Sequence, residues 1–234
     1  MNRRILKYFY KLVKPSIINY KNVQLKIDDS LISNHIKNII YNFTYEKEEI
    51  LILSKVLSKE DIVMEVGAGM GFLSTFCAKV NNSKVVAYEA NPNMIKLIKE
   101  NYILNNVKPN IKNIILSDKV GEVEFYIEKN FYSSSTQKRT EDAELIKVKT
   151  ENINNEIEKY KSTFLIIDIE GGEKDLIKKI DFSNNNINKI LIELHPHVIG
   201  DKNTNEVLKY IIDNNFLLDT AKSGNYVYYF YRDL

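Results

Sequence analysis

Cysteine is almost absent from this sequence, and its scarcity excludes two classes of protein. The chain has 234 residues and one cysteine, Cys77, so we expect neither a disulfide framework nor a metal cluster built on cysteines. Cys77 lies on the apolar face of an expected helix, and we interpret it as a small core residue.

Long apolar runs and a strong excess of one charge are missing as well. No stretch approaches the roughly 18 consecutive apolar residues of a membrane-spanning helix. The net charge is only +2, which argues against a dedicated nucleic-acid surface. With 44% hydrophobic and 27% charged residues, the chain is typical of one globular domain. We therefore expect a cytoplasmic protein that does not bind nucleic acid.

The most informative segment is residues 61–89. An apolar run at 62–66 is typical of a buried strand, and a helical pattern at 72–80 and a second apolar run at 85–88 follow. Between the first run and the helix lie three glycines, which permit a tight turn and close approach of a ligand: Gly67, Gly69 and Gly71. The second run ends in Glu89. This order indicates the first half of a doubly wound nucleotide-binding fold.

The acids around the glycine turn favour S-adenosylmethionine over a dinucleotide. Glu89 suits hydrogen bonding to the hydroxyls of a ribose, which both ligands carry. Glu65 precedes the first glycine by two residues, where its charge would repel a pyrophosphate and attract an ammonium and a sulfonium. The alternative is that Glu65 only bonds amides of the turn.

Further blocks of residues extend this pattern, and they give the chain a family resemblance. They are 87–93 (AYEANPN), Glu100-Asn101, Leu104-Asn105, 116–118 with Gly121-Glu122, 167–173 (IDIEGGE) and 192–195 (IELH). Together with 65–74 they resemble the FkbM-type family of S-adenosylmethionine-dependent methyltransferases. The glycine turn fits any class I methyltransferase, whereas 167–173 and 192–195 are family-specific. One departure is Ile166, where the family usually has a lysine, so that lysine's role in substrate binding or charge balance is not carried over.

The resemblance implies a cofactor site beyond the carboxyl ends of the core strands. It places Ser117 and Asp118 near the adenine ring, with a simple turn before Gly121 as the alternative. The predicted cofactor-binding residues are Glu65, Gly67, Ala68, Gly69, Gly71, Glu89, Ala90, Asn91, Ser117, Asp118 and Asp168. The cofactor is S-adenosyl-L-methionine.

The remaining periodicity predicts an α/β class I methyltransferase fold, Rossmann-like, with a seven-stranded, mostly parallel sheet. After a helix at 93–104, strands are expected at 111–116, 164–167 and 189–194, and helices at 175–180 and 204–214. An antiparallel hairpin at 216–219 and 226–231 is expected at one sheet edge. Residues 123–127 and 145–149 alternate like an added pair of strands.

Residues 1–57 are predicted to form an N-terminal helical extension that packs on a methyltransferase domain at 58–234. Residues 2–14 make a basic amphipathic helix that Pro15 ends. We interpret it as packing on its own domain; weak attachment to an anionic membrane or a partner enzyme is the alternative. A small strand at 20–27 and a helix at 50–57 follow. By resemblance, Tyr45 and Glu46 help to cover the cofactor; the alternative for Glu46 is that it only begins a surface helix.

Four polar residues follow two neighbouring core strands, and they are the candidate catalytic groups. Alternation points Asp168 and Glu170 the same way after one strand, and Glu193 and His195 follow the next. We predict that His195 accepts a proton from the acceptor, directly or through water, while Asp168 and Glu170 orient acceptor and donor. The alternative is that His195 only caps the strand. No metal site is predicted, although two carboxylates and a histidine are able to hold a divalent cation.

The sequence does not identify the molecule that accepts the methyl group. We expect Glu193, Ser134 and Tyr45 to contact it, with Ser134 in a polar segment at 131–144 that we interpret as a substrate loop. The alternative for this segment is that it is disordered. The resemblance implies O-methylation of a hydroxyl, mostly of sugars in glycans or of natural products. Two alternatives stay open: a catalytically inactive S-adenosylmethionine-binding scaffold in a glycan-assembly complex, and a nicotinamide-dependent oxidoreductase.

Overall fold

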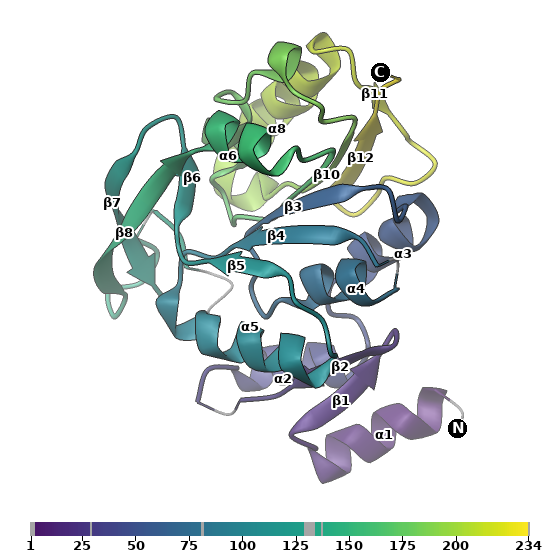
Figure 1. Cartoon of the computed structure of the whole chain (residues 1–234). Coiled ribbons are helices and arrows are strands. Elements are labelled where there is room, and N and C mark those ends of the chain that lie inside the picture. The colour runs from purple at the N-terminus through teal and green to yellow at the C-terminus, as the bar shows by residue number, and fades with distance from the viewer. Residues whose placement is uncertain (1–2, 29, 81, 129–133, 137, 234) are drawn as a thin grey trace.

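A seven-stranded sheet forms the centre of the protein in a computed structural model that describes residues 3–28, 30–80, 82–128, 134–136 and 138–233 (Figure 1). Its strand order is β11-β12-β10-β9-β3-β4-β5. The parallel strands are β3 (Ile62–Val66), β4 (Lys84–Tyr88), β5 (Asn110–Lys112), β9 (Phe164–Ile167) and β10 (Lys189–Glu193). At one edge β12 (Val227–Tyr231) pairs antiparallel with β10, and β11 (Leu217–Leu218) pairs antiparallel with β12. The predicted fold class and edge hairpin are confirmed.

Helices cover both faces of this sheet, so its middle strands are buried on both sides (Figure 1). One face packs against α3 (Lys47–Val56), α4 (Phe72–Val80) and α5 (Pro92–Leu104). The other packs against α6 (Ile153–Tyr160), α7 (Glu173–Ile177) and α8 (Pro196–Asp213). Strand alternation divides the apolar residues between two cores: Val63 belongs to the first and its neighbour Met64 to the second.

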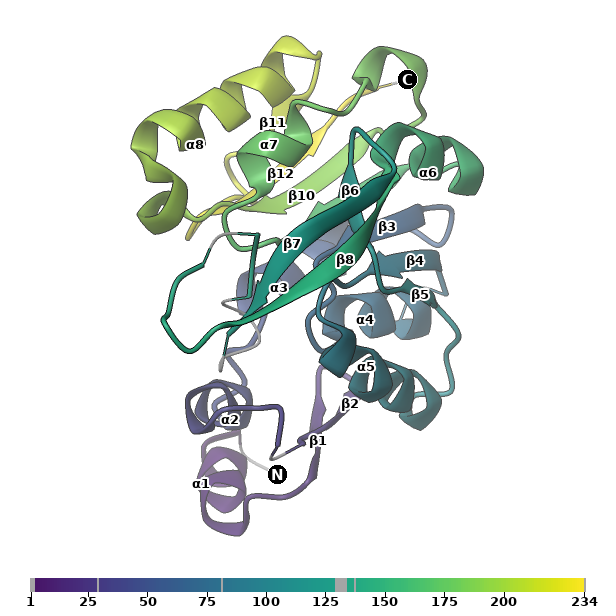
Figure 2. The same cartoon turned by 90° about the vertical axis from the view of Figure 1, so that its left-hand side faces the viewer.

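A three-stranded sheet in the order β6-β8-β7 stands beside the large sheet, in front of it in Figure 2. Its strands are β6 (Ile115–Ser117), β7 (Gly121–Ile127) and β8 (Glu144–Asn152), and the predicted pair of added strands is confirmed. The single strand predicted at 111–116 is wrong, because this run divides between the two sheets. Asn113 lies between β5 and β6. Its side-chain amide donates hydrogen bonds to the carbonyl oxygens of Glu89 and Ala90 (2.8 and 2.9 Å), which hold the chain where it leaves the large sheet.

The N-terminal part adds α1 (Arg3–Val13), a β1–β2 hairpin and α2 (Asn34–Tyr41). The small strand predicted at 20–27 is present as β2 (Val23–Lys26). Its partner β1 (Ile17–Tyr20) was not predicted; the two pair antiparallel around a two-residue turn with positive φ. Residue 2 of the predicted helix 2–14 lies outside the described residues. The division at 57/58 stays a prediction.

Helix α1 has one covered and one open side. Leu6 and Tyr10 pack against the first core, whereas Tyr8 and Leu12 are 78% and 85% exposed. Among the described residues, no helix combines the length and the apolar character needed to cross a bilayer.

Two helices differ from prediction. Helix α6 was not predicted; its buried Ile153 and Ile157 are one turn apart, and Asn152 caps its first amides. Helix α8 begins at Pro196 rather than near 204, with a break in helical geometry at Gly200 (φ 78°).

Candidate functional site

A cavity of about 690 Å³ lies where the parallel strands end. The turns after β3, β4 and β9 form its floor, and the three-stranded sheet and the start of α3 supply residues to its walls. Ligands bind beyond the carboxyl ends of the strands in open α/β sheets, so this cavity is the candidate site.

The glycine turn reaches the cavity because two of its residues lack side chains. Gly67 has φ 91°, and a Cβ there would lie 1.6 Å from the Asp168 carbonyl oxygen. At Gly71 (φ 72°), a Cβ would lie 2.8 Å from the Ile98 side chain. Only glycine therefore allows the turn to pass between the β9 turn and α5.

Glu89 is fixed by backbone amides on the cavity wall. Its carboxylate accepts hydrogen bonds from the amides of Gly69 and Asn91, both at 2.8 Å. Burial raises the pKa of Glu89 to about 7, although these amide bonds act to lower it. A carboxylate held in this way is suited to accept hydrogen bonds from the two hydroxyls of a ribose.

Glu65 lies beneath the turn rather than on the cavity wall. It is 1% exposed, and its carboxylate accepts hydrogen bonds from the side chain and amide of Ser74. Burial raises its pKa to about 8, and its Oε2 has no hydrogen-bond partner among the described residues. Its contact with a cationic ligand stays a prediction.

The other predicted cofactor residues divide into two groups. Those that line the cavity are Gly67, Gly69, Glu89, Ala90, Ser117 and Asp168, while Ala68, Gly71, Asn91 and Asp118 are set back from it. Asn91 caps α5 by accepting from the Asn93 amide, and Asp118 forms an ion pair with Lys179 at 3.2 Å. Ser117 ends β6, so it reaches the cavity from the small sheet and not from a core strand.

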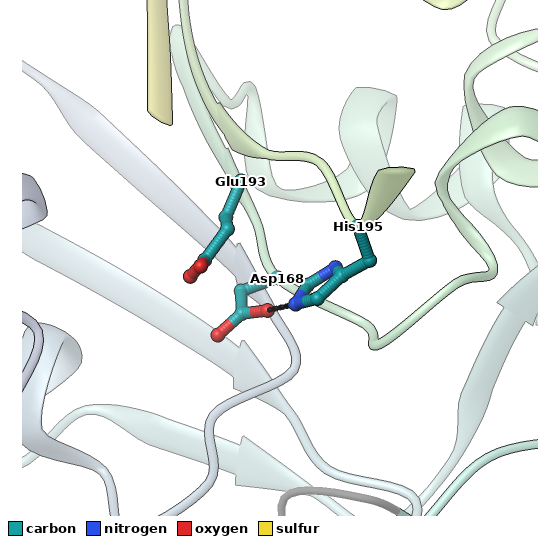
Figure 3. Close-up of side chains that lie close together, drawn as sticks. All are labelled: Asp168, Glu193 and His195. Atoms are coloured by element: carbon teal, nitrogen blue, oxygen red, sulfur yellow. Dashed lines mark ion pairs between the residues drawn. The ribbon is translucent and has the colours of Figure 1, made fainter. Parts of the chain in front are cut away.

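Carboxylates gather at the other end of the cavity, after β9 and β10. Asp168 and Glu193 lie side by side there (Figure 3), and Glu46, Glu49 and Glu170 also line the wall. Burial and the negative neighbours raise the pKa of Asp168 well above its ordinary value and that of Glu193 to about 10. The Oδ1 atom of Asp168 is buried and has no hydrogen-bond partner among the described residues.

His195 stands beside these carboxylates but does not itself line the cavity. Its Nδ1 is 2.7 Å from Oε1 of the fully buried Glu173. Its Nε2 lies 3.7 Å from Asp168 Oδ1 and 3.6 Å from Glu170 Oε2, beyond hydrogen-bond length. The structure thus brings the predicted catalytic residues together.

The charge state of His195 bears on its predicted role as a base. Burial alone would lower the pKa of His195, but the Glu173 hydrogen bond and the Glu170 charge outweigh it and raise the pKa above its ordinary value. A raised pKa makes the neutral ring a stronger base, but it also lowers the fraction of the ring that is neutral at a given pH. The assignment of His195 as base stays a prediction.

The predicted acceptor-binding residues all line the cavity: Glu193, Ser134 and Tyr45. Ser134 Oγ accepts from the Glu128 amide at 3.0 Å, while its neighbour Ser133 lies outside the described residues. Two residues were missed. Glu173 lies within the 167–173 block, so its nearness in sequence to Asp168 and Glu170 could have indicated that it belongs to the site. Arg139 lies 3.5 Å from Glu170, but no feature of the sequence indicated this contact.

Solved structures share this fold at low sequence identity. A methyltransferase from Pyrococcus furiosus aligns with 100% of this chain and 99% of its own, with a TM-score of 0.53 and 13% identity. A Pyrococcus abyssi tRNA (uracil-54, C5)-methyltransferase, solved with S-adenosyl-L-homocysteine, covers 93% of this chain and 43% of its own at 12% identity and a TM-score of 0.50. The fold is that of class I S-adenosylmethionine-dependent methyltransferases.

The sequence identifies the family within this class. Residues 61–218 match the Methyltransferase FkbM domain, so the chain belongs to the FkbM methyltransferase family, as the resemblance predicted, and its cofactor is S-adenosylmethionine. This finding decides against the nicotinamide-dependent alternative.

Curated relatives match only part of the chain. A Methanocaldococcus jannaschii protein named as a candidate protein N5-glutamine methyltransferase is 41% identical over 75 residues, 31% of this chain and 38% of its own. Protein arginine N-methyltransferase 1.1 of Arabidopsis thaliana is 35% identical over 89 residues, 38% of this chain and 22% of its own. The chain thus spans less than two fifths of the length of these relatives.

Proposed function

We propose that this protein transfers a methyl group from S-adenosylmethionine to a hydroxyl of a sugar or glycan. The observation that carries the proposal is Asp168, which lines the cavity and whose buried Oδ1 has no hydrogen-bond partner among the described residues. A buried acceptor atom without a donor is costly, and the hydroxyl of a bound acceptor would supply one. The same contact places a base at the proton that the hydroxyl must lose.

The cavity has the groups that the cofactor requires. Glu89 is placed to accept hydrogen bonds from the ribose, and Ile115 and Leu116 supply an apolar wall beside Ser117 for a base ring. The carboxylates at the far end favour a ligand that carries positive charge. When bound, S-adenosylmethionine supplies a methyl group on a positively charged sulfur.

The chain's own residues then act by position and charge. The walls hold the acceptor in line with the methyl group, which supplies much of the acceleration because two bound reactants behave as one. Asp168 orients the hydroxyl and takes its proton, and Glu170 and Glu193 set the local charge. The raised pKa values of these carboxylates make them stronger bases than free ones.

A second candidate is methylation of a nitrogen in a cationic acceptor. The crowded carboxylates Glu46, Glu49 and Glu193 would attract an amine or guanidinium, and the partial relatives named above carry N-methyltransferase names. The catalytically inactive scaffold is the third candidate. No nucleic-acid partner is proposed.

Two measurements separate these candidates. Calorimetry with S-adenosylmethionine, S-adenosylhomocysteine and NAD tests the cofactor. Transfer of labelled methyl to sugars, nucleotide sugars and arginine- or glutamine-containing peptides then tests the acceptor. Label in a sugar ether supports the proposal, label in a peptide favours the second candidate, and binding without transfer favours the scaffold.

The variant Asp168→Asn tests the assigned residue. We expect at least a roughly 100-fold loss of kcat with nearly unchanged affinity for S-adenosylhomocysteine, because a neutral amide cannot take the proton. The exposed carboxylate of Asp213, paired with Lys209, gives the matched control Asp213→Asn. An unchanged kcat in Asp168→Asn would exclude this role.

A further inference from the structure

Three possible metal ligands converge at the ends of β9 and β10 (Figure 3). One ligand atom from each of Asp168, Glu193 and His195 lies within 4.8 Å of the other two. Metal bonds of about 2.1 Å place neighbouring ligand atoms about 3 Å apart and opposite ones about 4.2 Å apart. Small rotations of the flexible Glu193 side chain would close the remaining gap.

The orientation of His195 points independently to a ligand. The side chain is 7% exposed, and Glu173 holds its Nδ1 at 2.7 Å. With the proton on Nδ1, the lone pair of Nε2 points at the oxygens of Asp168 and Glu170, 3.7 and 3.6 Å away. Lone pairs that face each other at this spacing repel, and a shared proton or one metal ion bound by these groups removes the repulsion. A carboxylate that fixes the far nitrogen of a ligating histidine is the usual support of a metal site.

The protein supplies little positive charge of its own at this point. Among the described residues, no lysine or arginine forms an ion pair with Asp168 or Glu193. Arg139 pairs with Glu170, at the same Oε2 atom that His195 Nε2 faces, and not with Asp168 or Glu193. Several carboxylates this close together repel one another, so a bound cation would stabilise the group.

We propose that Asp168, Glu193 and His195 bind one divalent metal ion, with Mn²⁺ as the best match. Two carboxylates favour hard ions such as Mg²⁺ and Mn²⁺, whereas an imidazole favours transition metals. Mn²⁺ satisfies both preferences. Three protein ligands leave positions open for water or an acceptor oxygen.

The catalytic use of this ion rests on the proposed function. In that reaction the acceptor oxygen bonds to the methyl carbon, the carbon–sulfur bond breaks with its electron pair left on sulfur, and the hydroxyl proton passes to a carboxylate. A cation that binds the hydroxyl oxygen lowers its pKa and favours this loss. His195 is then a ligand and not the base, and Asp168 binds the ion with one oxygen and takes the proton with the other.

Mn²⁺ binding is measured on tag-free protein without cofactor, from the loss of the free-ion signal in electron paramagnetic resonance. We expect one site per chain, and pulsed measurements should detect a directly bonded imidazole nitrogen. Glu193→Gln and Asp168→Asn should weaken Mn²⁺ binding at least about 10-fold. Glu173→Gln tests a positioning role: it should weaken binding and alter the nitrogen coupling, because the ring is no longer held.

His197→Gln is the matched control, because its ring lies next to His195 (centroids 5.7 Å apart) but outside the ligand set. It should leave Mn²⁺ affinity within about 2-fold of the parent protein. Calorimetry with S-adenosylhomocysteine shows that each variant is folded. Weak binding at several sites, binding unchanged in Glu193→Gln, or absence of nitrogen coupling would overturn the proposal. Mn²⁺ bound as expected without methyl transfer to any acceptor would instead count against the proposed function alone.

Discussion

Glu65 is almost fully buried beneath the glycine turn, and among the described residues no lysine, arginine or histidine forms an ion pair with it. Its partner in strand register is Ile166 on β9, which is 2% exposed. The FkbM-type pattern places a lysine at this position, where its stem would run beside Glu65. With isoleucine there, burial acts on Glu65 without a neighbouring positive charge, which agrees with a pKa near 8.

Ile166→Lys should therefore restore a charge pair with Glu65. We expect the substitution alone to change the free energy of unfolding only modestly, because pairing offsets desolvation. In the Glu65→Gln background the same lysine would be buried alone and destabilise by several kcal/mol. A double-mutant cycle from denaturant unfolding at pH 7 should give a coupling above about 1 kcal/mol; additivity within about 0.5 kcal/mol would contradict the pairing.

Gly67→Ala tests the close approach of the glycine turn to β9. A Cβ 1.6 Å from the Asp168 carbonyl forces the two turns apart. We expect S-adenosylhomocysteine affinity to fall at least about 10-fold and stability to fall by about 2 kcal/mol or more. Gly224→Ala is the control, because no atom lies within 4 Å of its added Cβ. Equal effects of the two variants in calorimetry and thermal unfolding would refute this account.

The sequence located those site residues that follow a strong strand signal. Asp168 and Glu193 come directly after or at the end of buried apolar runs, so their meeting at one sheet edge was predictable. The sequence did not show that the side chain of Glu65 lies beneath the glycine turn, or that Glu173 holds the ring of His195. Those features depend on side-chain directions that only packing determines. Arg139 comes from a polar segment with no periodicity, so its contact with Glu170 left no trace in the pattern.

At the scale of elements, the predictions held where burial was continuous. Strands β3, β4, β9 and β10 are apolar runs, and each was predicted to within about a residue. Helix α6 and the first turns of α8 were not predicted, and the strand boundaries failed where local turns set them. The side-chain amide of Asn113 holds the chain between the end of β5 and the start of β6. A turn with positive φ joins β1 and β2 into a hairpin. Such local bonds have no hydrophobic period.

Asn101 joins three elements through one buried amide. Its Oδ1 accepts from the Lys26 amide of β2 at 2.8 Å, and its Nδ2 donates to the Met70 carbonyl of the glycine turn at 2.9 Å. Asn105, one turn further along α5, bonds both backbone groups of Gln24 but does not reach the glycine turn. The hairpin therefore braces the cofactor site through α5.

Asn101→Ala should lower the free energy of unfolding by about 2–3 kcal/mol, because two buried backbone groups lose their partner. It should also weaken S-adenosylhomocysteine binding. Asn105→Ala should destabilise by a similar amount and leave that affinity nearly unchanged. Denaturant unfolding and calorimetry on both variants make the comparison; equal losses of affinity would mean that the Met70 contact is unimportant.

For the whole molecule, the buried acids predict that stability without ligands falls as pH rises. Burial raises the pKa of Glu89 to about 7 and that of Glu65 to about 8, so the folded state holds protons that the unfolded state releases near pH 4.5. The raised pKa of His195 acts in the same direction, because its stabilising contribution is lost as the ring loses its proton. The free energy of unfolding should be highest near pH 5 and decline towards pH 8.

Glu89→Gln should remove part of this slope between about pH 5 and 7, up to about 1.4 kcal/mol per pH unit for one proton. Thermal or urea unfolding across this range measures it. The exposed Glu122 offers the control Glu122→Gln, for which the slope should not change. Stability that rises from pH 5 to 8 in the parent protein would contradict the raised pKa values.

The small sheet has a consequence for how members of this family diverge. Its strands, and every cavity residue they and their connection supply, come from one continuous stretch between β5 and α6. The glycine turn, Glu89 and the carboxylates after β9 and β10 are encoded outside that stretch. Exchange of this one stretch would replace the wall that Ile115, Leu116 and Ser117 supply and would keep the glycine turn, Glu89 and the carboxylates.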